Sequence, residues 1–286
     1  MFARVASFRQ WLQRRWLYSG ISVLTIFTIA VGQPQIARAA EWWQILIQAA
    51  PSVIQVVKLN NITDAQEASF GAETNQALLS DKVRLYRNSA VTSYVDRIGQ
   101  RLARNSTRPN IKYTFQVIDD DAINAFATMG GYVYVNTGLM KAADNEAQLA
   151  GVIGHEIGHI ASRHSIQHIK KAAINQGIGS VTGLDRNQIV QLGVQLAMTL
   201  PNSRNDEYEA DRSGLTTMIK SGYAPTAMPE FMKKLISGNS APEFLSSHPA
   251  VSERVSNLQR MIPAAYKNRT DGLNASAYKQ NLRGFF

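Results

Sequence analysis

Two histidines four residues apart, His155 and His159, flank a glutamate, Glu156, inside an apolar stretch whose spacing predicts a helix. Residues four apart share one face of a helix about one turn apart, so both imidazoles can reach the same metal ion. The carboxylate of Glu156 can hold a water molecule at that ion and take its proton. The spacing predicts a catalytic zinc site; the alternative of two surface histidines on an amphipathic helix fits the apolar setting poorly.

A catalytic zinc ion usually has three protein ligands and one open position, so a third ligand is needed. His164 and His168 follow His159 by five and nine residues, which places them roughly 140° and 180° away around a continuous helix. Neither can reach the same ion if the helix continues, and we expect both to pack or to face solvent. The longer HExxHxxGxxH motif is absent, because Ser162 and Ser165 stand where its glycine and third histidine would be.

A second predicted helix carries Glu207, Glu209 and Asp211. Glu207 and Asp211 are four residues apart and share a face, whereas Glu209 points away from it. Glu207 is therefore the expected third ligand. Asp211, one turn further on, is expected to accept the second ring N–H of a ligating histidine and to fix its tautomer. The competing interpretation is a solvated acidic patch.

The remaining patterns predict an α+β fold, mainly helical, with a small antiparallel sheet beside the active-site helix. Apolar residues recur at helical spacing within 64–102, and they alternate over 111–118, as expected of a strand. A strand pair joined by a Gly-Gly turn is predicted over 125–135. The long helix is expected to begin near Asp144 or Asn145, whose side chains can cap it, and Gln148 is placed to close a capping box on Asn145. Helices are expected to dominate from there onward.

The N-terminal residues are typical of an export signal. A basic segment precedes the apolar residues 16–32, and small residues follow, so residues 1–39 are predicted to be a signal peptide cleaved after Ala39. The alternative is an uncleaved anchor. The arginines before the apolar segment predict that the rest of the chain lies outside the cytoplasm. Residues 40–60 are expected to form an apolar helical segment, whose residues 42–59 pack on the domain or contact a membrane surface peripherally.

Composition narrows the possible chemistry. The chain has no cysteine, which excludes disulfide scaffolds, thiolate zinc sites, iron–sulfur clusters and thiol proteases, and leaves His, Asp and Glu as the strong metal ligands. The net charge of +9 is partly local, because five arginines and no acidic residue lie in the first 39 residues. No long basic run occurs after them, so we expect no nucleic-acid partner.

The histidine and glutamate motifs of the chain resemble those of the membrane-linked zinc metallopeptidases. This family includes the HtpX-like heat-shock proteases, the CAAX prenyl proteases and their soluble periplasmic relatives. Four segments carry the resemblance: Asn124-Ala125-Phe126-Ala127 with Gly130-Gly131 and Thr137-Gly138-Leu139, His155 to His159, Glu207 to Asp211, and His248-Pro249 followed by Arg254. The resemblance implies a zincin-type peptidase domain over 61–262, followed by a tail at 263–286. No run of 18 apolar residues follows residue 60, so the chain resembles the short, soluble, exported branch.

The resemblance implies one zinc ion per chain, held by His155, His159 and Glu207. It assigns Glu156 as the catalytic base and Asp211 as the partner of a ligand. This assignment agrees with the one that helical geometry gives.

Further site residues are expected in the light of the resemblance. His248 is expected near the zinc, where it would donate a hydrogen bond to the developing oxyanion or occupy the open coordination position. Arg254 is expected to have a structural or a substrate-orienting role. The sheet segment 124–135, with Asn124, Ala125 and Phe126 as its candidate substrate-binding residues, would present an edge on which substrate lies as an added strand.

The expected function is an extracytoplasmic zinc metalloendopeptidase that hydrolyses unfolded or misassembled proteins, with envelope quality control inferred from the resemblance. Two alternatives remain open. One is a zinc-bound, autoinhibited, chaperone-like binding factor, in which His248 fills the site. The other is a zinc hydrolase of a non-peptide envelope component. The sequence does not predict the oligomeric state.

Overall fold

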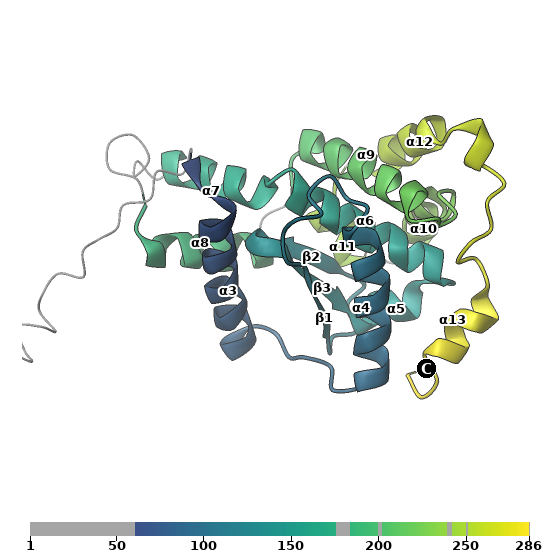
Figure 1. Cartoon of the computed structure of the whole chain (residues 1–286), viewed down its shortest axis with the longest axis horizontal. Helices are drawn as coiled ribbons and strands as arrows, with labels where there is room; N and C mark the ends of the chain where they lie inside the picture. The colour runs from purple at the N-terminus through teal and green to yellow at the C-terminus, as the bar shows by residue number, and fades with distance from the viewer. Residues whose placement is uncertain (1–60, 176–183, 200–201, 239–241, 250, 286) are drawn as a thin grey trace, which may run out of the picture. The chain divides into compact units, whose positions relative to one another are not determined.

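The computed structural model of the 286-residue chain describes residues 61–175, 184–199, 202–238, 242–249 and 251–285 (Figure 1). The chain divides into two units, Met1–Val53 and Ile54–Phe286, and every described residue belongs to the second. The predicted signal peptide and the apolar segment at 40–60 lie outside the described residues. Within the described part, no helix combines the length and the apolarity that crossing a membrane requires.

Two helices form where helical spacing predicts them, α3 (Asp64–Asp81) and α4 (Ser89–Ala103). Thr63 starts α3 in a capping box with Gln66, and the side chain of Asn88 accepts hydrogen bonds from the first turn of α4. The apolar positions of α4 are buried, as their spacing predicts. The stretch is interrupted between the two helices, where Leu85 forms a single bridge to Ile118.

The sheet has three strands in the order β1–β3–β2: β1 (Thr114–Ile118), β2 (Ala125–Thr128) and β3 (Tyr132–Asn136). β2 and β3 are antiparallel, as predicted, and the turn η2 (Met129–Gly131) joins them with positive φ at both glycines. The prediction of an antiparallel sheet is wrong for β1, which pairs with β3 in parallel. The chain reverses twice between these strands, so β3 regains the direction of β1 and lies between its neighbours, an order that residue alternation does not encode.

The helix α6 (Glu146–Ala161) comes after the short helix α5 (Thr137–Ala142) and is buried along nearly its whole length. It contacts α4, α9, α10 and the strands β2 and β3 (Figure 1). Asn145 caps it by accepting from the backbone N–H of Gln148 at 3.0 Å. The predicted reciprocal bond differs, because the side chain of Gln148 accepts from the N–H of Asp144 instead.

Helices dominate the chain after α6, as expected, and several are connected by segments outside the described residues. The later elements are α7 (His164–Asn175), α8 (Arg186–Thr199), α9 (Arg204–Lys220), α10 (Ala227–Ser237), α11 (Glu243–Ser247), α12 (Val251–Met261), η3 (Ala264–Tyr266) and α13 (Ala275–Asn281). The segment after the peptidase motifs packs on the core, where Tyr278 and Leu282 are buried and the hydroxyl of Tyr278 donates to the carbonyl of Met140.

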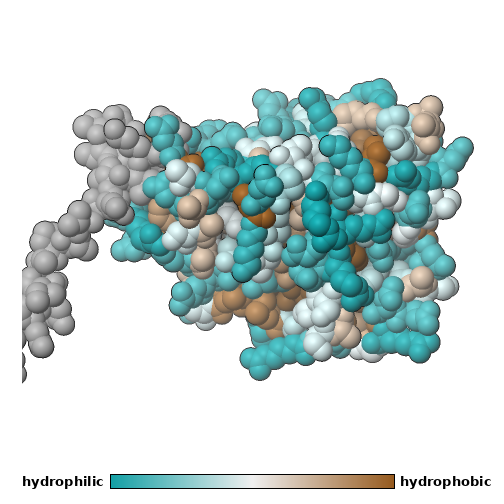
Figure 2. Space-filling model, viewed as in Figure 1, coloured by the Kyte–Doolittle hydropathy of each residue, from teal (hydrophilic) through white to brown (hydrophobic). Residues whose placement is uncertain are grey.

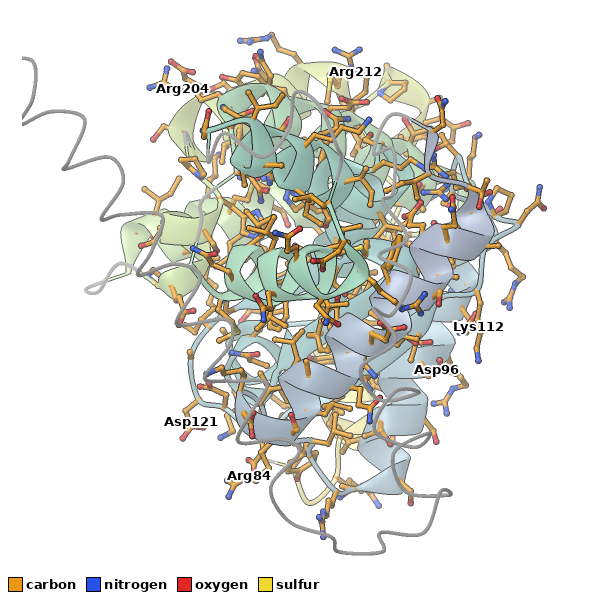
Figure 3. All side chains as sticks on the ribbon, turned by 90° about the vertical axis from the view of Figure 1, so that its left-hand side faces the viewer. Arg84, Asp96, Lys112, Asp121, Arg204 and Arg212 are labelled. Atoms are coloured by element: carbon orange, nitrogen blue, oxygen red, sulfur yellow. The ribbon has the colours of Figure 1, made fainter. Side chains whose placement is uncertain are left out.

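The face shown in Figure 2 is largely hydrophilic, with apolar side chains scattered over it. Charged side chains such as Arg84, Asp121 and Arg212 point outward in Figure 3. Acidic and basic residues are interspersed, and pairs such as Arg84 with Asp119 are exposed ion pairs that contribute little stability.

Candidate metal centre

The site depends on an unusually close approach of α6 and α9. A Cβ built on Gly158 of α6 would lie 2.6 Å from the carbonyl oxygen of Ala210, and one on Gly214 of α9 would lie 2.8 Å from the backbone nitrogen of His155. Only glycine fits at such backbone contacts. The close packing carries the side chain of Glu207 from α9 to the two histidines of α6.

The three predicted ligands converge on one point. Nε2 of His155 lies 3.0 Å from Nε2 of His159, and the two carboxylate oxygens of Glu207 lie 3.4 and 3.3 Å from these nitrogens. Ligand atoms bound to zinc at about 2.0–2.1 Å in a tetrahedron are roughly 3.3 Å apart. The donor set therefore fits a zinc ion in both chemistry and spacing.

His248, from the segment after α11, completes a cluster of four buried donors whose ligand atoms all lie within 4.8 Å of one another. Its Nδ1 lies 3.2 Å from Nε2 of His155 and 3.1 Å from Oε1 of Glu207. The ring stacks on Phe244, with centroids 4.4 Å apart. If all four donors held a zinc ion, no position would be left for water or substrate.

Glu156 lies beside the donors and is only 1% exposed. Its Oε1 accepts no hydrogen bond within the described part of the chain, although Nε2 of His248 lies 3.5 Å away. A buried acceptor without a donor is unusual. It marks the place where a water molecule or a substrate would donate a proton. Burial raises the pKa of this carboxyl above its usual range.

Asp211 lies behind His155, as predicted, with Oδ1 3.0 Å from Nδ1 of that histidine. Arg254 holds Asp211 through two hydrogen bonds of 2.8 and 2.7 Å, contacts Glu207, and donates to the carbonyl of His248 at 3.2 Å. Arg254 is fully buried and has no exposed surface for a substrate. Of the two roles expected for it, the geometry favours the structural one.

Burial and neighbouring charges shift the pKa values of the three predicted ligands in different directions. Burial lowers the pKa of His159 to about 3, so its imidazole is neutral and can offer a lone pair. Burial alone would also lower the pKa of His155, but the carboxylates of Glu207 and Asp211 raise it to about 9. Although burial opposes ionisation of Glu207, the charges of His248 and His155 hold its pKa well below the usual range.

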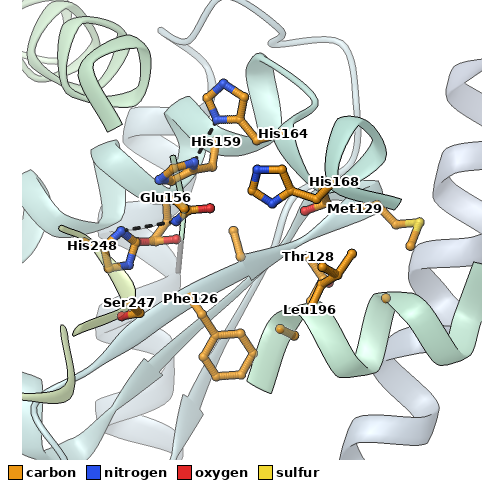
Figure 4. Close-up of a pocket in the computed structure, with 15 residues that line it drawn as sticks. Phe126, Thr128, Met129, Glu156, His159, His164, His168, Leu196, Ser247 and His248 are labelled. Atoms are coloured by element: carbon orange, nitrogen blue, oxygen red, sulfur yellow. Dashed lines mark hydrogen bonds and ion pairs between the residues drawn. The ribbon is translucent and has the colours of Figure 1, made fainter. Parts of the chain in front are cut away.

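A cavity of about 60 Å³ borders the donors (Figure 4). One wall comes from β2 and its turn, including Phe126 and Met129, and the opposite wall from α7 and α8. Of the three residues predicted to meet substrate, Phe126 lines this cavity. Ala125 is fully buried, and the amide of Asn124 donates to Glu243 at 3.0 Å.

His164 is the residue whose position helical geometry did not predict. The helix does not continue: α6 ends at Ala161, Arg163 adopts a positive φ of 56°, and α7 begins at His164. The turn places His164, which is buried, against the back of His159 rather than among the donors. His168 is half-buried and its Nε2 lies 2.9 Å from Asp206.

Two histidines of one helix and a glutamate of a second helix are placed to hold a metal ion, and a buried glutamate lies beside them. This arrangement is that of the zinc metallopeptidases of the HExxH class. A family model described as "Peptidase family M48" matches residues 89–262, and the chain belongs to this family. The zinc-peptidase family, the zinc cofactor and the α+β fold class predicted from the sequence are thereby confirmed.

Similar proteins carry peptidase names. The chain is 29% identical over 291 residues to "Beta-barrel assembly-enhancing protease" of Escherichia coli O157:H7, which covers 94% of this chain and 57% of that protein. It is 29% identical over 188 residues to "Mitochondrial metalloendopeptidase OMA1" of Schizosaccharomyces pombe, covering 62% of this chain and 55% of that protein. The chain thus spans little more than half the length of these relatives.

Proposed function

We propose that the chain is a zinc metalloendopeptidase that cleaves unfolded or misassembled proteins outside the cytoplasm, as part of envelope protein quality control. The proposal is carried by the convergence of three donor atoms from α6 and α9 beside the buried carboxylate of Glu156, whose Oε1 accepts no hydrogen bond within the described residues. The names of the relatives support a proteolytic role. The N-terminal pattern, which lies outside the described residues, supports export.

Each residue of the site has a distinct task in peptide hydrolysis. When bound, zinc supplies a Lewis acid that polarises the scissile carbonyl and makes water a nucleophile near neutral pH. Glu156 takes the proton of the attacking water and passes it to the leaving nitrogen. Its raised pKa suits both transfers, because the group can be a base in one step and an acid in the next. Asp211 and Arg254 keep the ligands in place.

The proposed substrate class rests on β2. This strand is at the edge of the described sheet and borders the cavity through Phe126 and Met129. An extended peptide can add to such an edge through backbone hydrogen bonds, which demand little sequence preference but do demand an unfolded segment. The cavity of about 60 Å³ is smaller than the roughly 300 Å³ at which ligand pockets begin. A bound peptide would therefore need more room than the wall formed by α7 and α8 leaves.

This substrate class predicts a difference between unfolded and folded targets. The purified chain should cleave casein, which lacks a stable fold, and leave a compact folded protein of similar size intact until that protein is denatured. Electrophoresis of timed digests, with zinc content determined in parallel, makes the comparison. Equal cleavage of the folded target would contradict recognition through an added strand. Failure to cleave any denatured protein by the zinc-loaded chain would favour a non-peptide substrate.

The second candidate function, an autoinhibited binding factor, is favoured by one observation: His248 lies within the donor set. A fourth protein ligand closes the position that substrate and water need. In this state the chain would hold zinc and bind unfolded protein without cutting it. Displacement of His248 would then convert the closed state into the active one.

Replacing His248 with alanine distinguishes the two roles expected of this residue. If His248 closes the site, His248→Ala should raise the rate of casein cleavage, by about tenfold where closure is favoured by about 1.4 kcal/mol. Initial rates at equal zinc occupancy provide the measurement. A fall in rate would instead assign His248 a role in stabilising the oxyanion.

A further inference from the structure

We propose that His164 is a positioning residue of the metal centre, which holds the imidazole of His159 in the tautomer and orientation that metal binding requires. The proposal rests on the zinc site of the proposed function. Nδ1 of His164 lies 2.8 Å from Nδ1 of His159, and a dashed line marks this contact in Figure 4. Because His164 is only 1% exposed, bulk water does not compete with it for the ring N–H of His159.

Metal binding by His159 decides which of the two rings donates the hydrogen bond between them. Nε2 of His159 faces the other ligands and needs a free lone pair to bind a metal, so Nδ1 of the same ring carries the proton. That N–H donates to His164, whose Nδ1 is therefore the acceptor. The proton of His164 is then on Nε2, which lies 3.4 Å from a carboxylate oxygen of Glu209. A chain of hydrogen bonds thus runs from His159 through His164 to Glu209.

The second ring nitrogen of each proposed ligand histidine is linked to a carboxylate. His155 donates its second ring N–H directly to Asp211, whereas His159 reaches Glu209 through His164. Both carboxylates come from α9, the helix that also supplies the ligand Glu207. Glu209, which points away from Glu207, thus contributes to the same centre from the other face of the helix. It also accepts from Ser162, at the end of α6, at 2.8 Å.

The turn that brings His164 to His159 is stabilised by two arginines that contact the buried carboxylate of Glu67. Arg163 adopts a left-handed conformation that is uncommon for a residue other than glycine. Its Nε lies 3.0 Å from the buried carboxylate of Glu67, and its Nη1 donates to the carbonyl of Ile62 at 3.1 Å. Arg108 binds the same carboxylate and donates to the carbonyl of Ile160, in the last turn of α6. These contacts fix the end of α6 and the start of α7.

Zinc affinity of the full chain, measured by competition with a chromogenic chelator, tests the proposal. His164→Leu removes the acceptor at similar size and should weaken zinc binding 10- to 100-fold, the usual effect of losing the partner of a ligand. His164→Asn keeps an acceptor oxygen near the position of Nδ1 and should retain most of the affinity. His164→Gln moves that oxygen outward and should behave like His164→Leu. In cobalt-substituted protein, the visible absorption spectrum should differ from the parent's most in His164→Leu and His164→Gln and least in His164→Asn.

His168→Ala is the matched control, because His168 lies one turn further along α7 and touches no ligand; its zinc affinity should equal the parent's. Parental affinity in His164→Leu would overturn the proposal. Equal losses of zinc affinity in His164→Asn and His164→Gln, with both shown to be folded by circular dichroism, would also overturn it. The comparison of these two variants is sufficient even if His164→Leu does not fold. A parent that binds zinc tightly but cleaves nothing would contradict the proposed function and leave this inference standing.

Discussion

Replacing Glu156 with glutamine is expected to lower cleavage of an unfolded protein by about 10²- to 10⁴-fold, the usual contribution of a general base. Glutamine keeps the size and the hydrogen-bonding oxygen of the side chain but cannot take a proton. Because Glu156 is not among the donor atoms that converge on the metal position, the variant should still bind one zinc ion. Initial cleavage rates and zinc content of the same preparations give both quantities.

The control for this variant is Glu230→Gln, which removes a carboxylate from an exposed position on α10 and should leave rate and zinc content unchanged. A Glu156→Gln protein that cleaves at the parental rate would remove Glu156 from the mechanism. Loss of zinc together with activity would show instead that the substitution damages the metal site.

The same residue predicts a pH dependence. Glu156 acts as a base only when ionised, and burial raises its pKa above the ordinary value for glutamate. Activity should therefore fall as the pH drops through this raised pKa, about tenfold per pH unit on the acid side. A profile of kcat/KM against pH at constant zinc occupancy should show this acid limb above the range of an unperturbed carboxyl. The residual activity of Glu156→Gln should lack the limb.

Replacing Arg254 with methionine should lower the free energy of unfolding by about 3–5 kcal/mol, because it leaves buried carboxylates without their partner. Arg254 is fully buried, forms two hydrogen bonds with Asp211 and contacts Glu207. Methionine fills much of the volume but carries no charge. The loss should be larger in zinc-free protein, since a bound zinc ion compensates the charge of Glu207.

Denaturant unfolding with and without a chelator measures this effect. Arg212→Met provides the comparison, because Arg212 is an exposed residue of α9 whose replacement should change stability by no more than about 0.5 kcal/mol. An Arg254→Met protein as stable as its parent would contradict the structural role. Normal stability with impaired cleavage alone would favour the substrate-orienting role instead.

Residue spacing predicts the centre of the site well, because helical periodicity is a local property. The four-residue separations in α6 and α9 bring His155 with His159, and Glu207 with Asp211, onto common faces. No spacing rule says that the two helices touch. That information lies in Gly158 and Gly214, whose missing side chains allow the backbones to meet, and a sequence read one helix at a time does not show it.

The features that sequence reasoning missed depend on where elements end and in what order they pack. Nothing before His164 marks the end of α6, since Arg163 takes a conformation usually left to glycine and contacts distant in sequence hold it there. The parallel pairing of β1 with β3 is likewise set by packing order. Arginine is seldom fully buried, so the interior position of Arg254 follows only from its carboxylate partners.

We infer that one zinc ion, held by His155, His159 and Glu207, is required for peptide hydrolysis. The most direct test of this requirement is the zinc content of the purified chain, with casein cleavage followed before chelation, after chelation and after zinc is restored. We expect about one zinc per chain, loss of cleavage when the metal is removed, and recovery when it returns. A chain that holds no zinc, or one that cleaves equally well without it, would contradict the requirement for zinc.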